Sequence, residues 1–299
     1  MPKGSSIGLR IAAAWACWLL GWRIQAQEKP ADPAIRLEND IVFGKGGDTE
    51  LKLDLAAPRE GEGPFPAIVC IHFGGWIRGE RQQMQATLAA FARRGFVAIS
   101  PDYRLAPRSR FPAPIEDCKA AVRWLRANAE RYRVAPSRIG AFGVSSGGHL
   151  ACLLGVTRKE DGLEGNGGNA DRSSEVQAVV SFFAPTDLTR PVWSKELREK
   201  QLEPFLGGTL AEKADTYRRA SPLAYVHKDA PPFLFVHGTA DTIVPIEQSE
   251  QMVEKLQKAG VSARLIRIEK EGHGLNRTSS SLRKSLADAV LFFDENLKK

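Results

Sequence analysis

The chain has 299 residues, of which 43% are hydrophobic and 26% charged, and its formal net charge is +7. These are ordinary values for a globular protein, so the composition excludes a disordered or fibrous chain. No segment repeats with a period of about 20–50 residues, which excludes solenoids and propellers. The positive charge is modest and is not gathered into a basic stripe, so we expect no nucleic-acid partner.

The first 26 residues have the pattern of a secretory signal peptide. A basic start is followed by an apolar run from Ile11 to Trp22, and Ala26 offers a cleavage point. An uncleaved membrane anchor is the alternative, but the run is shorter than the about 20 residues of a membrane span. Cleavage removes three basic residues and no acid, which lowers the net charge from +7 to +4. We therefore expect residues 27–299 to form a secreted or periplasmic domain without stable membrane association.

Three cysteines, Cys70, Cys118 and Cys152, follow the signal peptide, and each lies within an apolar segment. Their odd number and the absence of a CxxC spacing argue against a disulfide framework and against a zinc site. We expect buried free thiols and no metal or organic cofactor.

Short β-rich runs alternate with amphipathic segments along the chain. The expected strands are Ile35–Phe43, Leu51–Ala56, Ala67–Phe73, Phe96–Asp102, Ile139–Val144, Val176–Phe183, Phe233–His237 and Ala263–Ile268. The expected helices are Glu80–Arg94, Ile115–Arg131, Ser146–Val156, Glu247–Ala259 and Ser280–Leu297. The middle strands are continuously apolar, which is typical of parallel strands buried on both faces, whereas the first two alternate and suit an antiparallel edge. The alternation predicts an α/β fold, with a mostly parallel eight-stranded sheet flanked by helices.

Two segments interrupt this alternation. Arg158–Glu175 is polar and rich in glycine and asparagine, so we expect a mobile surface loop. Thr186–Pro231 is longer, charged and partly helical, and we expect it to form a small cap over the sheet.

A G-x-S-x-G motif, "GVSSG", runs from Gly143 to Gly147 between an expected strand and an expected helix. Glycines permit close backbone approach at a turn of this kind, and the turn exposes the central serine at the carboxyl edge of the sheet. The motif alone is also compatible with a plain glycine- and serine-rich turn. In this context it makes Ser145 the candidate nucleophile.

A serine nucleophile needs a base, and the chain has five histidines. His273 lies in the glycine-flanked loop "EGHG" after the last expected strand, which can carry an imidazole over the sheet edge, so it is the candidate base. We expect His149, one turn along the serine's own helix, to be structural, and His227 to lie at the surface. His72 and His237 end strands, and we expect them to shape the backbone or to support the site.

The base needs an acid that orients it and stabilises its cation. Asp241 follows the strand "PFLFVHG" and lies at the carboxyl end of that strand, where active sites of parallel sheets gather. A turn-capping role is the alternative for Asp241, and Asp187, after a neighbouring strand, is a rival that we expect to be structural. The chain order Ser145, Asp241, His273 agrees with that of α/β-hydrolases.

The segment "HFGGW", from His72 to Trp76, follows the expected strand Ala67–Phe73 and is suited to an oxyanion loop. Glycine lets backbone N–H groups point inward without steric penalty. We expect the amides of Gly74, Gly75 and Ser146 to be the donors, and Phe73 and Trp76 to contact substrate. A plain strand-ending turn is the alternative.

These motifs resemble the α/β-hydrolase superfamily, on the side of the hormone-sensitive-lipase-like esterases. The segments Pro101–Tyr132 and Ser221–Met252 resemble esterase segments before the serine and around the acid, and the likeness runs from Leu51 to Leu297. The group that the chain resembles most is that of the bifunctional feruloyl and acetyl-xylan esterases. Phe73 stands where many relatives have the first glycine of HGGG, so we expect a narrower acyl pocket. Kynurenine formamidases share the framework, so the subgroup stays open.

The resemblance implies the same nucleophile, acid, base and oxyanion donors. The expected function is that of a secreted serine carboxylester hydrolase, which removes acetyl or feruloyl groups from polysaccharide through an acyl-enzyme. A small-molecule or carbohydrate ester would be its substrate. The alternatives are a short-chain carboxylesterase, an arylformamidase-like hydrolase, a prolyl-oligopeptidase-type peptidase and a non-catalytic binding protein on the same scaffold.

Overall fold

The computed structural model describes residues 32–274 and 280–298. The chain divides into two units, Met1–Asp32 and Pro33–Lys299, and the second unit holds the sheet and its helices. The predicted signal peptide, residues 1–26, lies outside the described residues.

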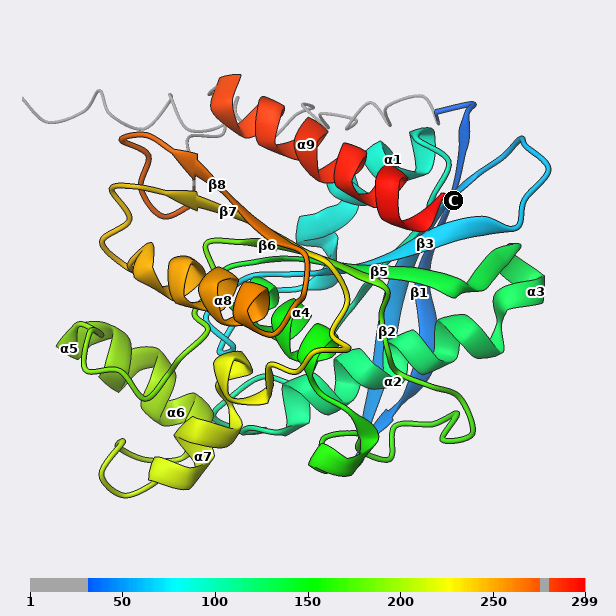
Figure 1. Cartoon of the computed structure of the whole chain (residues 1–299). Helices are drawn as coiled ribbons and strands as arrows, with labels where there is room; N and C mark the ends of the chain where they lie inside the picture. Colours follow the sequence, from blue (N-terminus) through cyan, green and yellow to red (C-terminus); the bar gives the residue numbers. More distant parts are fainter. Residues whose placement is uncertain (1–31, 275–279, 299) are drawn as a thin grey trace, which may run out of the picture. The chain divides into compact units, whose positions relative to one another are not determined.

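Eight strands form one sheet in the order β1-β2-β4-β3-β5-β6-β7-β8 (Figure 1). They are β1 (Ile35–Gly46), β2 (Thr49–Pro58), β3 (Phe65–Ile71), β4 (Val97–Pro101), β5 (Val134–Val144), β6 (Ala178–Phe182), β7 (Phe233–Gly238) and β8 (Ala263–Ile268). β1 pairs antiparallel with β2, and β2 pairs antiparallel with β4. From β4 onward, in the order β4-β3-β5-β6-β7-β8, all neighbours pair parallel. The predicted mostly parallel eight-stranded sheet is therefore confirmed. β3 has the predicted length but begins and ends two residues earlier, because His72 and Phe73 leave the sheet and begin the loop that follows it.

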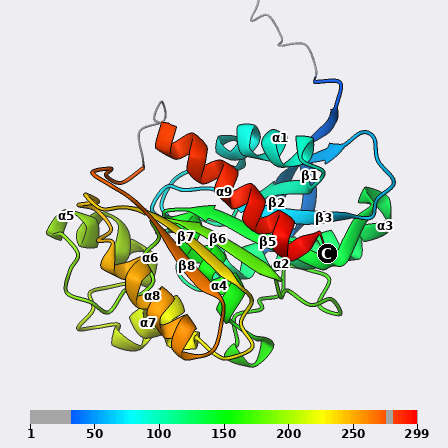
Figure 2. The same cartoon turned by 45° about the horizontal axis from the view of Figure 1, so that its top comes forward.

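Helices cover both faces of the sheet. α1 (Gln85–Arg93) and α9 (Ser280–Leu297) lie on one face, and α2 (Ala113–Ala127), α4 (Ser146–Val156) and α8 (Glu247–Lys258) lie on the other (Figures 1 and 2). Buried side chains accordingly form two clusters, and successive residues of β3 alternate between them: Ile68 and Cys70 belong to one, and Val69 and Ile71 to the other. This double burial explains why the middle strands are continuously apolar.

Shorter elements complete the unit. They are a 3₁₀ turn at Arg81–Met84, α3 (Ala129–Tyr132), a 3₁₀ turn at Lys159–Asp161, and, between β6 and β7, α5 (Lys195–Leu197), a π-helical turn at Arg198–Leu202, α6 (Glu203–Leu206), α7 (Ala214–Arg219) and a 3₁₀ turn at Pro222–Tyr225. The elements between β6 and β7 form the insertion that the sequence places at 186–231.

The polar segment 158–175 differs from the mobile loop that its composition predicts. Glu164 accepts hydrogen bonds from Lys119 Nζ at 2.7 Å and from Arg123 Nη1 at 2.8 Å. Both basic side chains are buried in α2, with no more than 2% of their surface exposed. A buried charge is costly unless it is paired, so these two cations hold the segment against the helix.

Another buried cation, Arg81, connects the strands at the antiparallel edge of the sheet. Its guanidinium pairs with Asp40 of β1, with Asp54 of β2 at 2.8 Å, and with Asp102 just after β4. Asp54 is itself buried, with 1% of its surface exposed, whereas the side chain of Asp40 is largely exposed. The pair that matters for stability is therefore that between Arg81 and Asp54.

We expect Arg81→Met to lower the free energy of unfolding by about 3–5 kcal/mol, because it leaves the buried carboxylate of Asp54 without its counter-charge. Asp40→Asn is the matched control and should cost less than about 1 kcal/mol, since it removes only the exposed partner. Urea denaturation followed by circular dichroism measures both. Equal losses in the two variants would show that the buried pair does not hold this edge.

Candidate active site

The turn between β5 and α4 holds Ser145 in an unusual backbone conformation, with φ 54° and ψ −119°. The N–H of Ser145 donates to the carbonyl of Phe182 at 2.9 Å, which anchors the turn to β6. A Cβ at Gly143 would lie 2.1 Å from the carbonyl oxygen of Gly147, and a Cβ at Gly147 would lie 2.2 Å from that of Ile71. Both motif glycines are thus required because backbone approaches backbone. The turn stores strain, which is common at functional sites.

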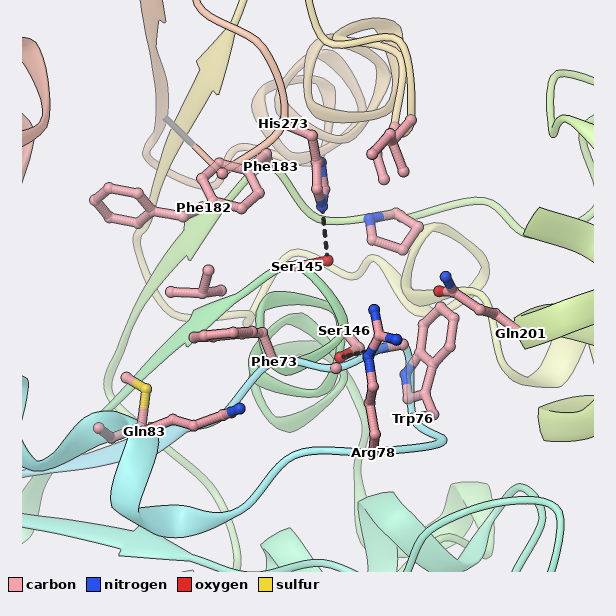
Figure 3. Close-up of a pocket in the computed structure, with 18 of the residues that line it drawn as sticks. Phe73, Trp76, Arg78, Gln83, Ser145, Ser146, Phe182, Phe183, Gln201 and His273 are labelled. Atoms are coloured by element: carbon pink, nitrogen blue, oxygen red, sulfur yellow. Dashed lines mark hydrogen bonds between the residues drawn. The ribbon is translucent and has the colours of Figure 1, made fainter. Parts of the chain in front are cut away.

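The structure brings the predicted nucleophile, base and acid into one hydrogen-bonded line. Ser145 Oγ lies 2.9 Å from His273 Nε2 (Figure 3), and His273 Nδ1 lies 2.8 Å from Asp241 Oδ2. An ionised carboxylate only accepts hydrogen bonds, so Nδ1 carries the ring proton and Nε2 is free to accept the proton of the serine hydroxyl. The ring of Phe183 packs edge-on against the imidazole, with the ring centroids 4.8 Å apart. This arrangement can activate a serine as a nucleophile.

Asp241 is buried but stays ionised. Burial raises its pKa, but hydrogen bonds from His237 and His273, attraction to the His273 imidazole and the N–H of Val244 together hold the pKa well below its usual range. Its second oxygen, Oδ1, accepts the N–H groups of Ile243 and Val244, each at 2.9 Å. Every oxygen of this carboxylate is therefore satisfied by a donor, which is what a buried charge needs.

His237 is the second histidine at the acid. Its Nε2 lies 2.9 Å from the carbonyl oxygen of Val244 and 3.2 Å from Asp241 Oδ2, and its Nδ1 lies 2.7 Å from Ser249 Oγ. Because a carbonyl cannot donate, Nε2 must carry the proton, and Nδ1 accepts from the serine hydroxyl. Asp241 Oδ2 thus receives one N–H from His273 and another from His237. The sequence indicates only that His237 ends a strand in a supporting position.

The oxyanion loop follows β3, and its glycines have φ angles of 136° at Gly74 and 64° at Gly75, which only glycine adopts easily. Within the described chain, the amides of Gly74 and Ser146 have no hydrogen-bond partner. The amide of Gly75, by contrast, donates to Ser146 Oγ at 3.0 Å. Two of the three predicted donors are therefore free, and the third is engaged because the residue after the nucleophile is a serine. The part of Gly75 in binding an oxyanion stays a prediction.

The other histidines lie outside this line. His149 is fully buried; it accepts from the indole N–H of Trp76 at 3.2 Å and lies 2.6 Å from the carbonyl oxygen of Ala220. Burial lowers its pKa to about 4, so it is neutral. His72 stacks on Tyr103, with the ring centroids 4.1 Å apart.

Two more candidates are also engaged elsewhere. His227 lies 2.9 Å from Arg158 Nη2. Asp187 accepts from the N–H and hydroxyl of Thr189, as expected of a residue that caps a turn.

A pocket of about 660 Å³ opens at Ser145, within the size range of small-molecule sites. Phe73 and Trp76, the two predicted substrate contacts, both line it, and so does Arg78. Phe183 and Gln201 also line it, and the sequence analysis did not single them out. Several lining residues, Gln201 among them, come from the insertion between β6 and β7, which therefore forms part of the pocket wall. Local sequence patterns predict this insertion but do not show which of its side chains line the pocket.

Among the described residues, no group of His, Cys, Asp or Glu side chains is arranged to hold a metal ion. None of the helices in that part of the chain is long and apolar enough to cross a membrane. Cys70, Cys118 and Cys152 are buried free thiols, and burial raises the pKa of each, to about 12 for Cys152.

The contacts of His237 predict a positioning role that a fluorophosphonate probe for activated serines can measure. His237→Leu removes one donor from the Asp241 carboxylate, which then attracts the protonated imidazole of His273 more strongly and orients it less firmly. We expect labelling of Ser145 to slow about tenfold, which corresponds to one charge-assisted hydrogen bond of about 1.4 kcal/mol. The acidic limb of the pH–rate profile should move to higher pH.

His237→Gln retains an N–H at a similar reach and is the conservative control, which should restore most of the labelling rate. A purely structural role would leave the pH profile of His237→Leu superimposed on that of the wild type.

Comparisons with known proteins agree with this geometry. The BD-FAE family matches residues 53–256. Esterase LipC of Mycobacterium tuberculosis is 30% identical over 239 residues, which cover 77% of this chain and 58% of the relative. Esterase LipQ of the same organism is 32% identical over 231 residues, which cover 75% of this chain and 53% of the relative. The chain thus spans little more than half the length of these curated relatives.

A solved structure named as a truncated form of carbohydrate esterase from gut microbiota superimposes with a TM-score of 0.78 at 29% identity. The match covers 88% of this chain and 97% of that one. Esterase 2 of Thermogutta terrifontis, phosphoramylated by tabun, has a TM-score of 0.73 at 30% identity and covers 88% and 95% of the two chains. Since the family match extends over more than half of the sequence and the sheet is that of an α/β-hydrolase, the chain belongs to the BD-FAE family.

Proposed function

We propose that the chain is a serine carboxylester hydrolase that works through an acyl-enzyme. The observation that carries this proposal is the line from Ser145 Oγ to His273 at 2.9 Å and from His273 to Asp241 at 2.8 Å. Free amides at Gly74 and Ser146 beside the serine add donors where an oxyanion would form. The names of the relatives, which are esterases, also support it.

The geometry supports a two-step reaction. Ser145 Oγ attacks the acyl carbonyl carbon while its proton passes to His273 Nε2, and the amides of Gly74 and Ser146 donate to the carbonyl oxygen as it becomes negative. Asp241 stabilises the imidazolium. His273 then gives the proton to the leaving alcohol, and an acyl-enzyme remains on Ser145. A water molecule, deprotonated by the same imidazole, attacks the acyl-enzyme and releases the acid, which restores the serine.

The substrate that we propose is an acetyl or feruloyl ester on a polysaccharide. The carbohydrate esterase from gut microbiota, of which this chain covers 97%, favours a carbohydrate alcohol. The pocket of about 660 Å³ is far larger than an acetyl group, and aromatic side chains such as Phe73, Phe182 and Phe183 line it, which suits an aromatic acyl group. Export, which the first 26 residues predict, would bring the enzyme to such a polymer; it stays a prediction.

Replacement of the nucleophile tests the mechanism. We expect Ser145→Ala to lower kcat/KM for p-nitrophenyl acetate by at least about 10⁴-fold, because no other group can form the acyl-enzyme. Ser173→Ala, in the surface segment 158–175, is the control and should retain full activity. Near-wild-type turnover by Ser145→Ala would overturn the proposal.

A panel of esters tests the substrate. Acetyl, butyryl and feruloyl esters of one alcohol, with acetylated xylan alongside, should show release of acid from the feruloyl ester and from the polymer. Hydrolysis confined to short acyl esters of simple alcohols would leave the chemistry intact and remove the carbohydrate assignment, in favour of a short-chain carboxylesterase.

A further inference from the structure

We infer that the pocket is built for an ester that carries a carboxylate, and that Arg78 binds this carboxylate. The inference rests on the proposed ester hydrolysis and names the class of ester. It starts from the charges that face the pocket. Among the described residues that line it, Arg78 is the one permanently charged side chain, and no aspartate, glutamate or lysine is present. A site with a single fixed positive charge favours neutral or negative ligands.

The guanidinium of Arg78 is unpaired. It makes no hydrogen bond or ion pair with any other residue of the described chain, and the side chain is exposed. Other arginines near the sheet form ion pairs. Arg104 pairs with Asp117 at 2.8 Å, and Arg81 and Arg123 each have a carboxylate partner. Arg78 therefore offers the pocket all of its donors, in the planar fork that matches a carboxylate.

Two unpartnered side-chain amides also line the pocket. The side chains of Gln83 and Gln201 line the same pocket, and neither makes a side-chain hydrogen bond within the described chain. Figure 3 shows Gln201, Arg78 and Trp76 on one side of Ser145, and Phe73, Phe182 and Gln83 on the opposite side. Arg78 and Gln201 thus form a polar arm of the pocket, and Phe73 and Phe182 line the arm on the other side of the nucleophile (Figure 3).

The polar arm begins at the oxyanion loop itself. A Cβ at Gly74 would lie 3.2 Å from Arg78 Cγ, and a Cβ at Gly75 would lie 2.2 Å from Gln201 Oε1. Both side chains therefore pack directly on the backbone that holds the oxyanion donors. A carboxylate on Arg78 would be held close to the reacting carbonyl, where binding energy also orients the substrate.

A carboxylate can belong to either half of such an ester. On the alcohol half it would be the uronate of an acidic polysaccharide, and on the acyl half it would make the substrate a half-ester of a dicarboxylic acid. In both cases the recognition chemistry is the same: a planar anion on a guanidinium, with the side-chain amide of Gln201 beside it (Figure 3). Two pairs of probes separate the two sources.

The experiment compares each anionic ester with its neutral methyl ester on the full chain. The alcohol-side pair is 4-acetoxybenzoate and methyl 4-acetoxybenzoate, and the acyl-side pair is monophenyl succinate and phenyl methyl succinate. The quantity measured is the ratio of kcat/KM for the anionic ester to that for the neutral one. The intrinsic reactivity of each ester cancels when this ratio is compared between variants, and the neutral ester reports that a variant is folded.

We expect Arg78→Gln to lower this ratio about tenfold for one of the two pairs, which is the loss typical of a charge-assisted hydrogen bond. That pair identifies the half that bears the carboxylate. Arg78→Lys should retain part of the ratio, because it keeps the charge and loses the fork. Added salt should lower the wild-type ratio in the same direction.

Arg108→Gln is the matched control. Arg108 is exposed, lies outside the pocket lining and has no ion pair in the described chain, so the change in net charge is the same. An equal fall in Arg108→Gln, or a fall in Arg78→Gln that is equal for the anionic and neutral esters, would overturn the inference. If the wild type hydrolysed neither neutral ester, the proposed function itself would fail, and this outcome is distinct from the others.

Discussion

The candidate site depends on one constraint, the close approach of three backbone segments at the carboxyl edge of the sheet. The end of β3, the end of β5 and the first turn of α4 come together so tightly that Gly143 and Gly147 have no room for a side chain. This crowding forces Ser145 into a conformation that costs about 1–3 kcal/mol, and the bond from its N–H to Phe182 keeps it there. The strain places Oγ in front of the sheet edge, where a hydroxyl on regular strand or helix backbone would not reach. Burial of apolar side chains on both faces of the same strands offsets the cost of this strained conformation.

A second close approach brings the acid and the base together. A Cβ at Gly238 would lie 2.2 Å from the carbonyl oxygen of Glu271, and the N–H of Ala240 donates to that carbonyl at 2.9 Å. The loop after β7 and the loop after β8 are thereby locked to each other, each a few residues from Asp241 or His273. The imidazole is thus oriented by backbone contacts as well as by its hydrogen bond to the carboxylate. This is why the acid can remain buried and ionised: its donors are fixed before any charge moves, so little reorganisation is needed.

Sequence patterns predict the bounds of a helix or strand well where local features of the sequence determine them. The bounds of β8, α4 and α9 agree with those predicted, because periodicity and flanking glycines or serines mark them. The chain order of the three site residues, and their places at strand ends, could also be read from the sequence. What could not be read depends on contacts between distant segments. Composition makes 158–175 a mobile loop, yet Glu164 meets two cations that are 41 and 45 residues away along the chain. The proton on His237 Nε2 follows from a carbonyl that only the fold places beside it.

The engagement of Gly75 by Ser146 is compatible with an oxyanion site because of the relative strength of the bonds involved. A hydrogen bond to a full negative charge is roughly twice as strong as one to a neutral hydroxyl, so an oxyanion would outcompete Ser146 Oγ for the Gly75 amide. The change requires only that a serine hydroxyl rotates between staggered positions, whereas the backbone amides of Gly74 and Ser146 already lack a competing acceptor in the described chain. Before substrate arrives, the same hydroxyl satisfies a backbone N–H that would otherwise have no partner. In the proposed reaction, the serine after the nucleophile would hold the loop in place before substrate binds and would give up its bond to the Gly75 amide when the negative charge forms.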